Sequence, residues 1–522
     1  MKKGIALILV AGLLFTASPL LVYAAPEEGS AVEATSDNDG SLSEENLPAE
    51  SEESLQGAST GAQDNIVTTK HTAVINGKNL SYTADTGTMV VETCGTECEF
   101  FYTAYTLDGV EDKSERPISF AFNGGPGSAS VGLHLICLGP KRVELDDVGN
   151  AVSLPSKIVD NDNSILEFTD LVFIDPVGTG YSRALDPAME ETFYDSDNDV
   201  YSVGDFIRLY LNRYKRWGSE KYIIGESYGT IRAVGVCEYL SGKYMTDING
   251  LILIGSVNDY SSVLYTSGND LPYALFLPTM AADAWYHKAI SKEYLDMELK
   301  DYLDEVRDFV SSEYVSALFM GNRLTKQEKE ELAKKISGYI GLPEDYVLES
   351  DLRITNDDFF SELFKDQKKV IGRMDGRIVG YGEGDPSLTD YSILVGNSIV
   401  KYITEELGFE TDRPYNILSD EVLSQWKFGV HDIMDQGYVS QEADIEYILS
   451  HNRFLRVWVI SGYYDGATPF YGQEWIFSHA YGDDFQNSPI FTYYPAGHMF
   501  YTDKESFDAF RDDAEKWFTN DK

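Results

Sequence analysis

The chain has 522 residues, 43% of them hydrophobic, which is enough for a large core with insertions and ordinary for a globular enzyme. It carries 41 basic and 86 acidic residues, so its formal net charge is −45 at pH 7. Such a charge repels phosphate backbones and disfavours a nucleic-acid partner, and it is typical of a heavily solvated surface that keeps a secreted protein soluble.

The N-terminal segment predicts export. Two lysines precede an apolar run over residues 4–22, and the small residue Ala24 stands at a suitable cleavage position. This pattern indicates a signal peptide over residues 1–24 and a secreted or extracytoplasmic protein. The alternative is a permanent N-terminal anchor, because the apolar run approaches membrane-spanning length. No later apolar run is long enough to span a membrane, so we expect no stable membrane insertion.

An acidic leader is predicted over residues 25–63. It is rich in Glu, Asp, Ser, Ala and Gly and contains no Lys or Arg. Such a composition buries too little apolar surface to offset its ordering entropy, so we expect this leader to be disordered. The catalytic domain is predicted over residues 64–522. Period-two runs at 66–69 and 99–103 indicate antiparallel strands near its start.

From residue 116 the pattern changes to apolar strands that end in glycine-rich turns. These runs are 117–122, 171–174, 221–224, 251–254 and 457–460. Because continuous apolar strands alternate with helical segments, we expect an α/β fold with a mostly parallel central sheet and helices on both faces.

The strand pattern largely disappears between about residues 261 and 433. Residues 299–309 and 326–336 instead carry helical spacing with many exposed charges. This change predicts a helical cap, inserted at about residues 261–433, over the catalytic edge of the sheet. Strand and helix patterns return from about Arg453 to the C-terminus.

Four cysteines are too few for a disulfide scaffold in a chain of this length. Cys94 and Cys98 flank a short turn, where either a bridge across a hairpin tip or two free thiols would fit. Cys137 and Cys237 stand among apolar or small residues and are predicted to be buried free thiols. No histidine or second cysteine pair accompanies Cys94 and Cys98, so we predict no metal site.

Ser227 is the predicted nucleophile. It stands in residues 225–229 (GESYG), after an apolar strand and before a helix of small residues. This is the strand–turn–helix context of a nucleophile elbow, in which glycines permit the sharp turn. A serine hydroxyl is a weak nucleophile and needs an adjacent base.

Among seven histidines, His498 is the predicted base, because it follows a strand-like run in a loop near the C-terminus. Asp465 follows the strand before that loop and is predicted to orient the imidazole. The order Ser227, Asp465, His498 is that of α/β-hydrolases. Asp175 also ends a strand, but it precedes the nucleophile and is interpreted as a structural turn carboxylate.

The chain resembles a known family through four motifs in the same order. They are 123–128 (NGGPGS), 175–182 (DPVGTGYS), 225–229 (GESYG) and 497–499 (GHM). With these motifs, residues 65–522 resemble the serine carboxypeptidases, and the chain is identified as a secreted, bacterial-type member. The resemblance implies an α/β-hydrolase fold and removal of C-terminal residues from peptides, typically at acidic pH. It implies peptide or protein C-termini as substrates and no metal or organic cofactor.

The resemblance also assigns roles to residues near Ser227. It implies an oxyanion hole formed by the main-chain N–H groups of Gly125 and Tyr228, which is a large contribution in acyl transfer. The substrate's free carboxylate would be bound by the Asn123 side chain and Glu226, with Gly124 beside them. Met499 would line the pocket of the departing residue. A carboxyl group that binds a carboxylate must share a proton with it, which predicts tighter binding at acidic pH.

Two positions depart from the family pattern. Cys137 stands where many relatives carry a glutamate that supports the carboxylate network, and Tyr463 stands where many carry an aspartate before the catalytic one. The first departure weakens the case for strict C-terminal specificity. An esterase or acyltransferase on the same fold therefore remains the alternative, and a catalytically silent surface-binding protein is a second one. The sequence makes no prediction of an oligomeric state.

Overall fold

The computed structural model describes residues 61–382, 384–387, 391–428, 439–480 and 488–519. The predicted signal peptide and all but the last three residues of the predicted leader lie outside the described residues, as does His431. All the described elements belong to one unit, Ser59–Lys522.

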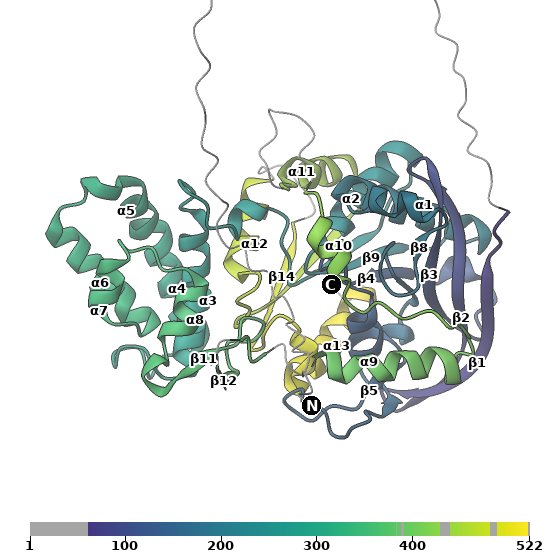
Figure 1. Ribbon diagram of the computed structural model, residues 1–522, viewed down its shortest axis with the longest axis horizontal. Helices are drawn as coiled ribbons and strands as arrows, with labels where there is room; N and C mark the ends of the chain where they lie inside the picture. The colour runs from purple at the N-terminus through teal and green to yellow at the C-terminus, as the bar shows by residue number, and fades with distance from the viewer. Residues whose placement is uncertain (1–60, 383, 388–390, 429–438, 481–487, 520–522) are drawn as a thin grey trace, which may run out of the picture. The chain divides into compact units, whose positions relative to one another are not determined.

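A ten-stranded sheet runs through this unit (Figure 1). Its strands are β1 (Asn65–Ile75), β2 (Lys78–Thr93), β3 (Thr96–Leu107), β4 (Ile118–Phe122), β7 (Asp170–Ile174), β8 (Arg183–Ala184), β9 (Lys221–Glu226), β10 (Gly250–Ile254), β13 (Arg456–Gly462) and β14 (Ile490–Tyr494). The order is β1-β2-β3-β7-β4-β9-β10-β13-β14, with β8 paired to β3. Strands β7 to β14 of this path are parallel, and β1, β2 and β3 are antiparallel to their neighbours. The mostly parallel sheet is confirmed.

Helices cover both faces of the parallel strands, which is why β4, β7, β9 and β10 are buried at every position. Alternate residues of each strand enter opposite core clusters: Ile223 and Leu253 pack on one face, and Ile224 and Ile252 on the other. The first face is covered by α1 (Ser196–Arg213), α2 (Gly229–Tyr244), α11 (Glu442–His451) and α12 (Phe470–His479). The second is covered by a π-helix (Leu133–Leu138), α9 (Tyr391–Lys401) and α13 (Lys504–Thr519) (Figure 1).

Between β10 and β13 the chain forms a helical insertion with a core cluster of its own. Its elements include α3 (Leu271–Tyr286), α4 (Leu299–Phe309), α5 (Val315–Met320), α6 (Lys326–Ile340), α7 (Glu344–Glu349), α8 (Asn356–Glu362), the short strands β11 (Lys369–Ile371) and β12 (Val379–Tyr381), and α10 (Asp420–Gln425). The apolar residues of α4, among them Tyr302 and Val306, face this cluster, while its charged residues form surface ion pairs. We refer to α3–α8 with β11 and β12 as the cap. A further two-stranded sheet joins β5 (Lys141–Val143) to β6 (Ile158–Asp160).

All four cysteines are free thiols. Cys94 and Cys98 lie near the β2–β3 turn without a bridge, and each thiol donates instead to a main-chain carbonyl oxygen, of Asn198 and Val91 respectively. Cys137 and Cys237 are buried, as expected from their apolar setting. In the part of the chain that is described, no helix combines the length and the apolar character that a membrane crossing requires.

Candidate active site

Ser227 occupies the turn between β9 and α2. Its φ is +58°, in the left-handed region that costs energy for a residue with a side chain. This geometry is that of a nucleophile elbow, because it turns the side chain away from the strand and the helix. The Ser227 N–H donates to the carbonyl oxygen of Ile254 on the neighbouring strand β10, at 2.9 Å, and so fixes the turn to the end of the sheet.

Asp465 lies just after β13 and has no exposed surface. Its Oδ1 accepts from the N–H groups of Ala467 (2.8 Å) and Thr468 (2.9 Å). Its Oδ2 accepts from the Thr468 hydroxyl at 2.6 Å and lies 2.7 Å from Nδ1 of His498. Because three donors from the turn that follows β13 hydrogen bond to the carboxylate, this turn determines how the carboxylate faces the imidazole.

His498 follows β14 and is almost completely buried. Burial by itself lowers the pKa of its imidazole, but the negative charges of Asp465 and Glu226 outweigh burial, so the pKa lies above its ordinary value. The His498 N–H donates to the carbonyl oxygen of Met374 in the cap, at 2.7 Å. Of the six histidines that the structure describes, His498 alone hydrogen bonds to a carboxylate.

Parallel strand ends bring these residues to one edge of the sheet. β9 pairs with β10, and β10 pairs with β13. Gly255 follows β10, and its N–H donates to Ile460 on β13 at 2.9 Å. A Cβ atom at Gly255 would lie 2.8 Å from Cε1 of His498, so the imidazole packs against Gly255. Gly255 directly follows Ile254, whose carbonyl oxygen accepts from the Ser227 N–H. The structure therefore places Ser227 at the same edge of the sheet as the hydrogen-bonded pair His498 and Asp465.

The loop after β4 lies against the Ser227 turn. A Cβ atom at Gly124 would lie 2.5 Å from the main-chain nitrogen of Tyr228, a distance that only glycine tolerates. In the described residues, no acceptor within the protein is hydrogen bonded to the N–H of Gly125 or of Tyr228. Two main-chain donors beside the predicted nucleophile have the composition that an oxyanion hole requires.

A buried ion pair contacts the loop after β4 and stabilises its position. Arg232 of α2 pairs with Asp199 of α1 at 2.8 Å, and both side chains are buried. The Arg232 guanidinium also donates to the carbonyl oxygen of Asn123 at 2.7 Å and lies over the Tyr228 ring. Sequence reasoning missed Arg232, because only the fold reveals that its side chain returns to the β4 loop.

A second carboxyl group, Glu226, precedes Ser227 at the end of β9 and is buried. The Asn123 amide donates to its Oε2 at 2.6 Å. The hydroxyl of Tyr501 lies 2.9 Å from both of its oxygens. Burial raises the pKa of Glu226 to about 7, although His498, Tyr501 and Asn123 each lower it. Tyr501 was not predicted, since it is 275 positions away in the chain.

Met499 and Cys137 border the same region. Met499 is partly buried and packs on the core cluster that also contains Cys137 and Tyr501. Cys137 is fully buried, and after burial itself the charge of Glu226 is the main reason that the pKa of its thiol is raised. The thiol is therefore neutral, and at this position it adds no charge beside Glu226.

The rejected candidate Asp175 lies elsewhere. It follows β7 and accepts from the N–H of Ser130 and the hydroxyl of Tyr415, both at 2.8 Å. Its hydrogen bonds connect loops, and none of them reaches a histidine, which agrees with its interpretation as a structural carboxylate. Burial raises the pKa of Asp175 to about 6.

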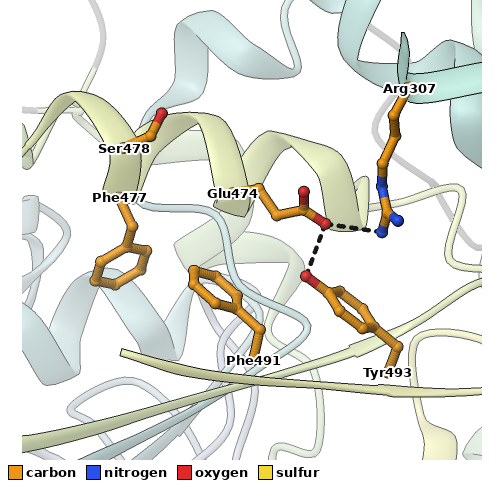
Figure 2. Close-up of a pocket in the computed structure, with 6 residues that line it drawn as sticks. All are labelled: Arg307, Glu474, Phe477, Ser478, Phe491 and Tyr493. Atoms are coloured by element: carbon orange, nitrogen blue, oxygen red, sulfur yellow. Dashed lines mark hydrogen bonds and ion pairs between the residues drawn. The ribbon is translucent and has the colours of Figure 1, made fainter. Parts of the chain in front are cut away.

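A pocket of about 390 Å³ opens where the cap meets the edge strand β14. Glu474 of α12 accepts from Arg307 of α4 at 2.8 Å and from the Tyr493 hydroxyl at 2.7 Å, and both contacts are drawn in Figure 2. Phe477 and Phe491 complete its apolar side. None of the residues that line this pocket is a predicted site residue. Its hydrogen bonds instead join the cap to α12 and β14.

Comparison with known proteins identifies a family. The model of the serine carboxypeptidase family matches residues 77–337, which is half of the chain. A pheromone-processing carboxypeptidase KEX1 from Yarrowia lipolytica is 26% identical over 207 residues, which cover 37% of this chain and 30% of that protein. Serine carboxypeptidase-like 37 from Arabidopsis thaliana is 26% identical over 166 residues, which cover 30% of this chain and 32% of that protein. The chain thus matches about a third of the length of these relatives.

A solved structure shares the fold over a longer range. The crystal structure of KEX1ΔP, a prohormone-processing carboxypeptidase from Saccharomyces cerevisiae, aligns with a TM-score of 0.54 and 15% identity. The alignment covers 84% of this chain and 92% of that one. At this level of identity the likeness concerns the fold, and it agrees with the α/β-hydrolase architecture described above.

Proposed function

Because the chain belongs to the serine carboxypeptidase family, we propose that it is a carboxypeptidase that releases C-terminal residues from peptides through an acyl-enzyme intermediate. The observation that carries the proposal is the buried Asp465–His498 pair, at the strand edge that holds Ser227, next to the Asn123–Glu226 pair. The first pair supports serine hydrolase chemistry. The second supports selection of substrates that end in a carboxylate.

In the proposed reaction, Oγ of Ser227 attacks the carbonyl carbon of the last peptide bond, and Nε2 of His498 accepts the hydroxyl proton. Asp465 accepts from Nδ1–H and stabilises the imidazolium that forms. The main-chain N–H groups of Gly125 and Tyr228 donate to the oxyanion. His498 then protonates the departing amine, and a water molecule, activated by the same imidazole, hydrolyses the acyl-enzyme.

Recognition of the substrate's C-terminus depends on the protonation of Glu226. With a pKa of about 7, its carboxyl group is largely neutral below that pH and can donate a hydrogen bond to the substrate carboxylate. Above that pH two carboxylates would face each other and repel. Binding of free-acid substrates should therefore improve as the pH falls through 7, with Asn123 as a second donor and Gly124 and Met499 beside it.

The decisive experiment compares blocked dipeptides that carry a free or an amidated C-terminus between pH 4 and 8. The proposal expects hydrolysis of the free acid, little or no hydrolysis of the amide, and a preference for the free acid that grows toward acidic pH. Equal cleavage of acid and amide would refute carboxypeptidase selectivity while leaving a serine hydrolase. An esterase or acyltransferase would use the same Ser-His-Asp arrangement but has no need of the Asn123–Glu226 pair.

The enzyme chemistry itself has a separate test. A fluorophosphonate probe should label Ser227 in the folded protein, because the probe reacts with an activated serine. Absence of labelling in folded protein would favour a catalytically silent binding protein instead. Export is part of the proposal and is supported by the apolar segment at residues 4–22. It is tested by finding the protein outside the cytoplasm, cleaved after Ala24.

A further inference from the structure

We propose that Tyr501 positions Glu226 by donating a hydrogen bond to it, and that Glu226 takes up a single proton when the site binds a substrate's C-terminal carboxylate. This inference rests on the proposed function, because it concerns how that site receives a C-terminal carboxylate. Tyr501 itself is held in a short 3-10 helix (Phe500–Thr502) that follows His498 and Met499, so the base and the phenol are carried on one continuous segment.

Both carboxyl oxygens of Glu226 accept hydrogen bonds from neighbouring side chains. Tyr501 has no exposed surface, and its hydroxyl lies 2.9 Å from both Oε1 and Oε2. Asn123 donates to Oε2 at 2.6 Å, and its own Oδ1 accepts from the N–H of Leu133 at 3.0 Å, which fixes the amide orientation. Oε1 is therefore the oxygen with fewer donors and the one on which a proton can be carried toward a substrate.

The charged groups that face Glu226 come from the ends of two strands. His498 and Asp465 lie at the ends of β14 and β13, and their charges act on Glu226 in opposite directions. Tyr501 and Asn123 contribute neutral donors, and Cys137 of the π-helix contributes a neutral thiol. No second carboxyl group of the protein hydrogen bonds to Glu226 among the described residues, so its protonation is not shared with another acid.

A phenol beside a carboxyl group acts differently from a second carboxyl group. Two adjacent carboxyl groups repel when both are ionised, so one keeps its proton and the pair titrates in coupled steps. The Tyr501 hydroxyl donates to Glu226, and this hydrogen bond favours the ionised form of the carboxyl group. The empty site can then hold Glu226 as an anion near pH 7 and above, and it gains one proton when the substrate carboxylate arrives.

The test uses the full chain with Ser227→Ala, so that blocked dipeptides bind without being cleaved. Calorimetry in buffers of different ionisation enthalpy counts the protons taken up on binding between pH 6 and 8.5. The number of protons taken up should approach one at pH 8.5, and the Glu226→Gln substitution should abolish this uptake. Adding Tyr501→Phe should raise the pH midpoint of free-acid binding by about one unit, since one hydrogen bond to a carboxylate is worth roughly one pKa unit.

Tyr494→Phe is the matched control. It removes a buried phenol hydroxyl from the same core cluster, where that hydroxyl donates to Asp513 at 3.0 Å, and it should leave the midpoint unchanged. An unshifted midpoint in Tyr501→Phe, or an equal shift in both variants, overturns the role of Tyr501. Uptake of two protons overturns the single-proton site even if Tyr501→Phe does not fold. If the parent protein binds the amidated dipeptide as well as the free acid, the proposed function fails instead.

Discussion

Asp465 is the residue on which the orientation of His498 depends. Its carboxylate receives three hydrogen bonds from the turn that follows β13 and presents one oxygen to Nδ1 of the imidazole at 2.7 Å. At the residue scale, the proposed mechanism therefore requires this acceptor rather than a general negative charge, because an acceptor determines which imidazole nitrogen carries the proton.

Replacing Asp465 with Asn should lower kcat by about four orders of magnitude, because an amide can stabilise the wrong imidazole tautomer. Steady-state kinetics on a free-acid peptide measures the effect. Asp175→Asn is the matched control: it alters another buried carboxylate at a strand end, but one that bonds to Ser130 and Tyr415. It should reduce stability and leave kcat within a few-fold. A comparable loss of kcat in both variants would contradict the assignment of Asp465.

Glu226→Gln should remove the pH dependence of substrate binding. A glutamine amide donates to a carboxylate without taking up a proton, whereas Glu226 must be protonated and its pKa is about 7. The KM of a free-acid peptide should therefore rise between pH 6 and 8.5 in the parent enzyme and stay nearly constant in the variant. A KM that rises equally in both proteins would show that another group controls binding.

At the scale of elements, the loop after β4 and the turn after β9 act as one unit. Their main chains approach so closely at Gly124 that a Cβ atom would lie 2.5 Å from Tyr228 N. Arg232 connects the same two segments, because its guanidinium donates to the carbonyl oxygen of Asn123 and lies over the Tyr228 ring. The positions of both proposed oxyanion donors therefore depend on how these two elements pack.

Gly124→Ala should separate these segments and lower kcat by about 10²–10³-fold, the effect of losing one oxyanion donor. Gly242→Ala provides a control within α2, since a Cβ atom there would lie 3.4 Å from its nearest neighbour, the Glu238 side chain, at an ordinary contact distance. That variant should keep wild-type kcat and gain up to about 1 kcal/mol of helix stability. A Gly124→Ala enzyme with wild-type kcat would argue against the oxyanion role.

Sequence patterns predicted the parallel strands because each is a continuous apolar run that ends in a turn. They predicted β2 less well, since its 16 residues include Asp85 and Gly87, and only pairing with both β1 and β3 makes it a strand. The same distinction holds in the site. Ser227, Asp465 and His498 carry local turn motifs, whereas Tyr501 is brought to Glu226 solely by tertiary packing.

At the scale of the whole molecule, buried carboxyl groups set the pH range of stability. Burial raises the pKa of Asp175 and Asp444 to about 6 and that of Glu226 to about 7. The folded state thus binds more protons than the unfolded state near pH 5 to 7, so these groups lower the free energy of unfolding as pH rises. Burial lowers the pKa of His134 to about 3 and also lowers the pKa values of His71 and His287, and these three groups act in the opposite direction.

The midpoint of thermal unfolding should therefore be several degrees higher at pH 5.5 than at pH 8. The net charge of −45 strengthens the trend, because ionising further acids adds to self-repulsion. Calorimetry at constant ionic strength measures the difference, and Glu226→Gln should reduce it. A midpoint that stays level or rises toward pH 8 would contradict the raised pKa values.

The contact between the cap and His498 has a consequence for protein engineering. Because the carbonyl oxygen of Met374, between β11 and β12, accepts from the His498 N–H, the insertion helps to position the proposed base. A chimera that exchanges the whole insertion for that of a relative would exchange this support as well. Crossovers placed before β11 and after β12 would leave the native hairpin in place, so that new cap helices could be recombined without disturbing the His498 imidazole.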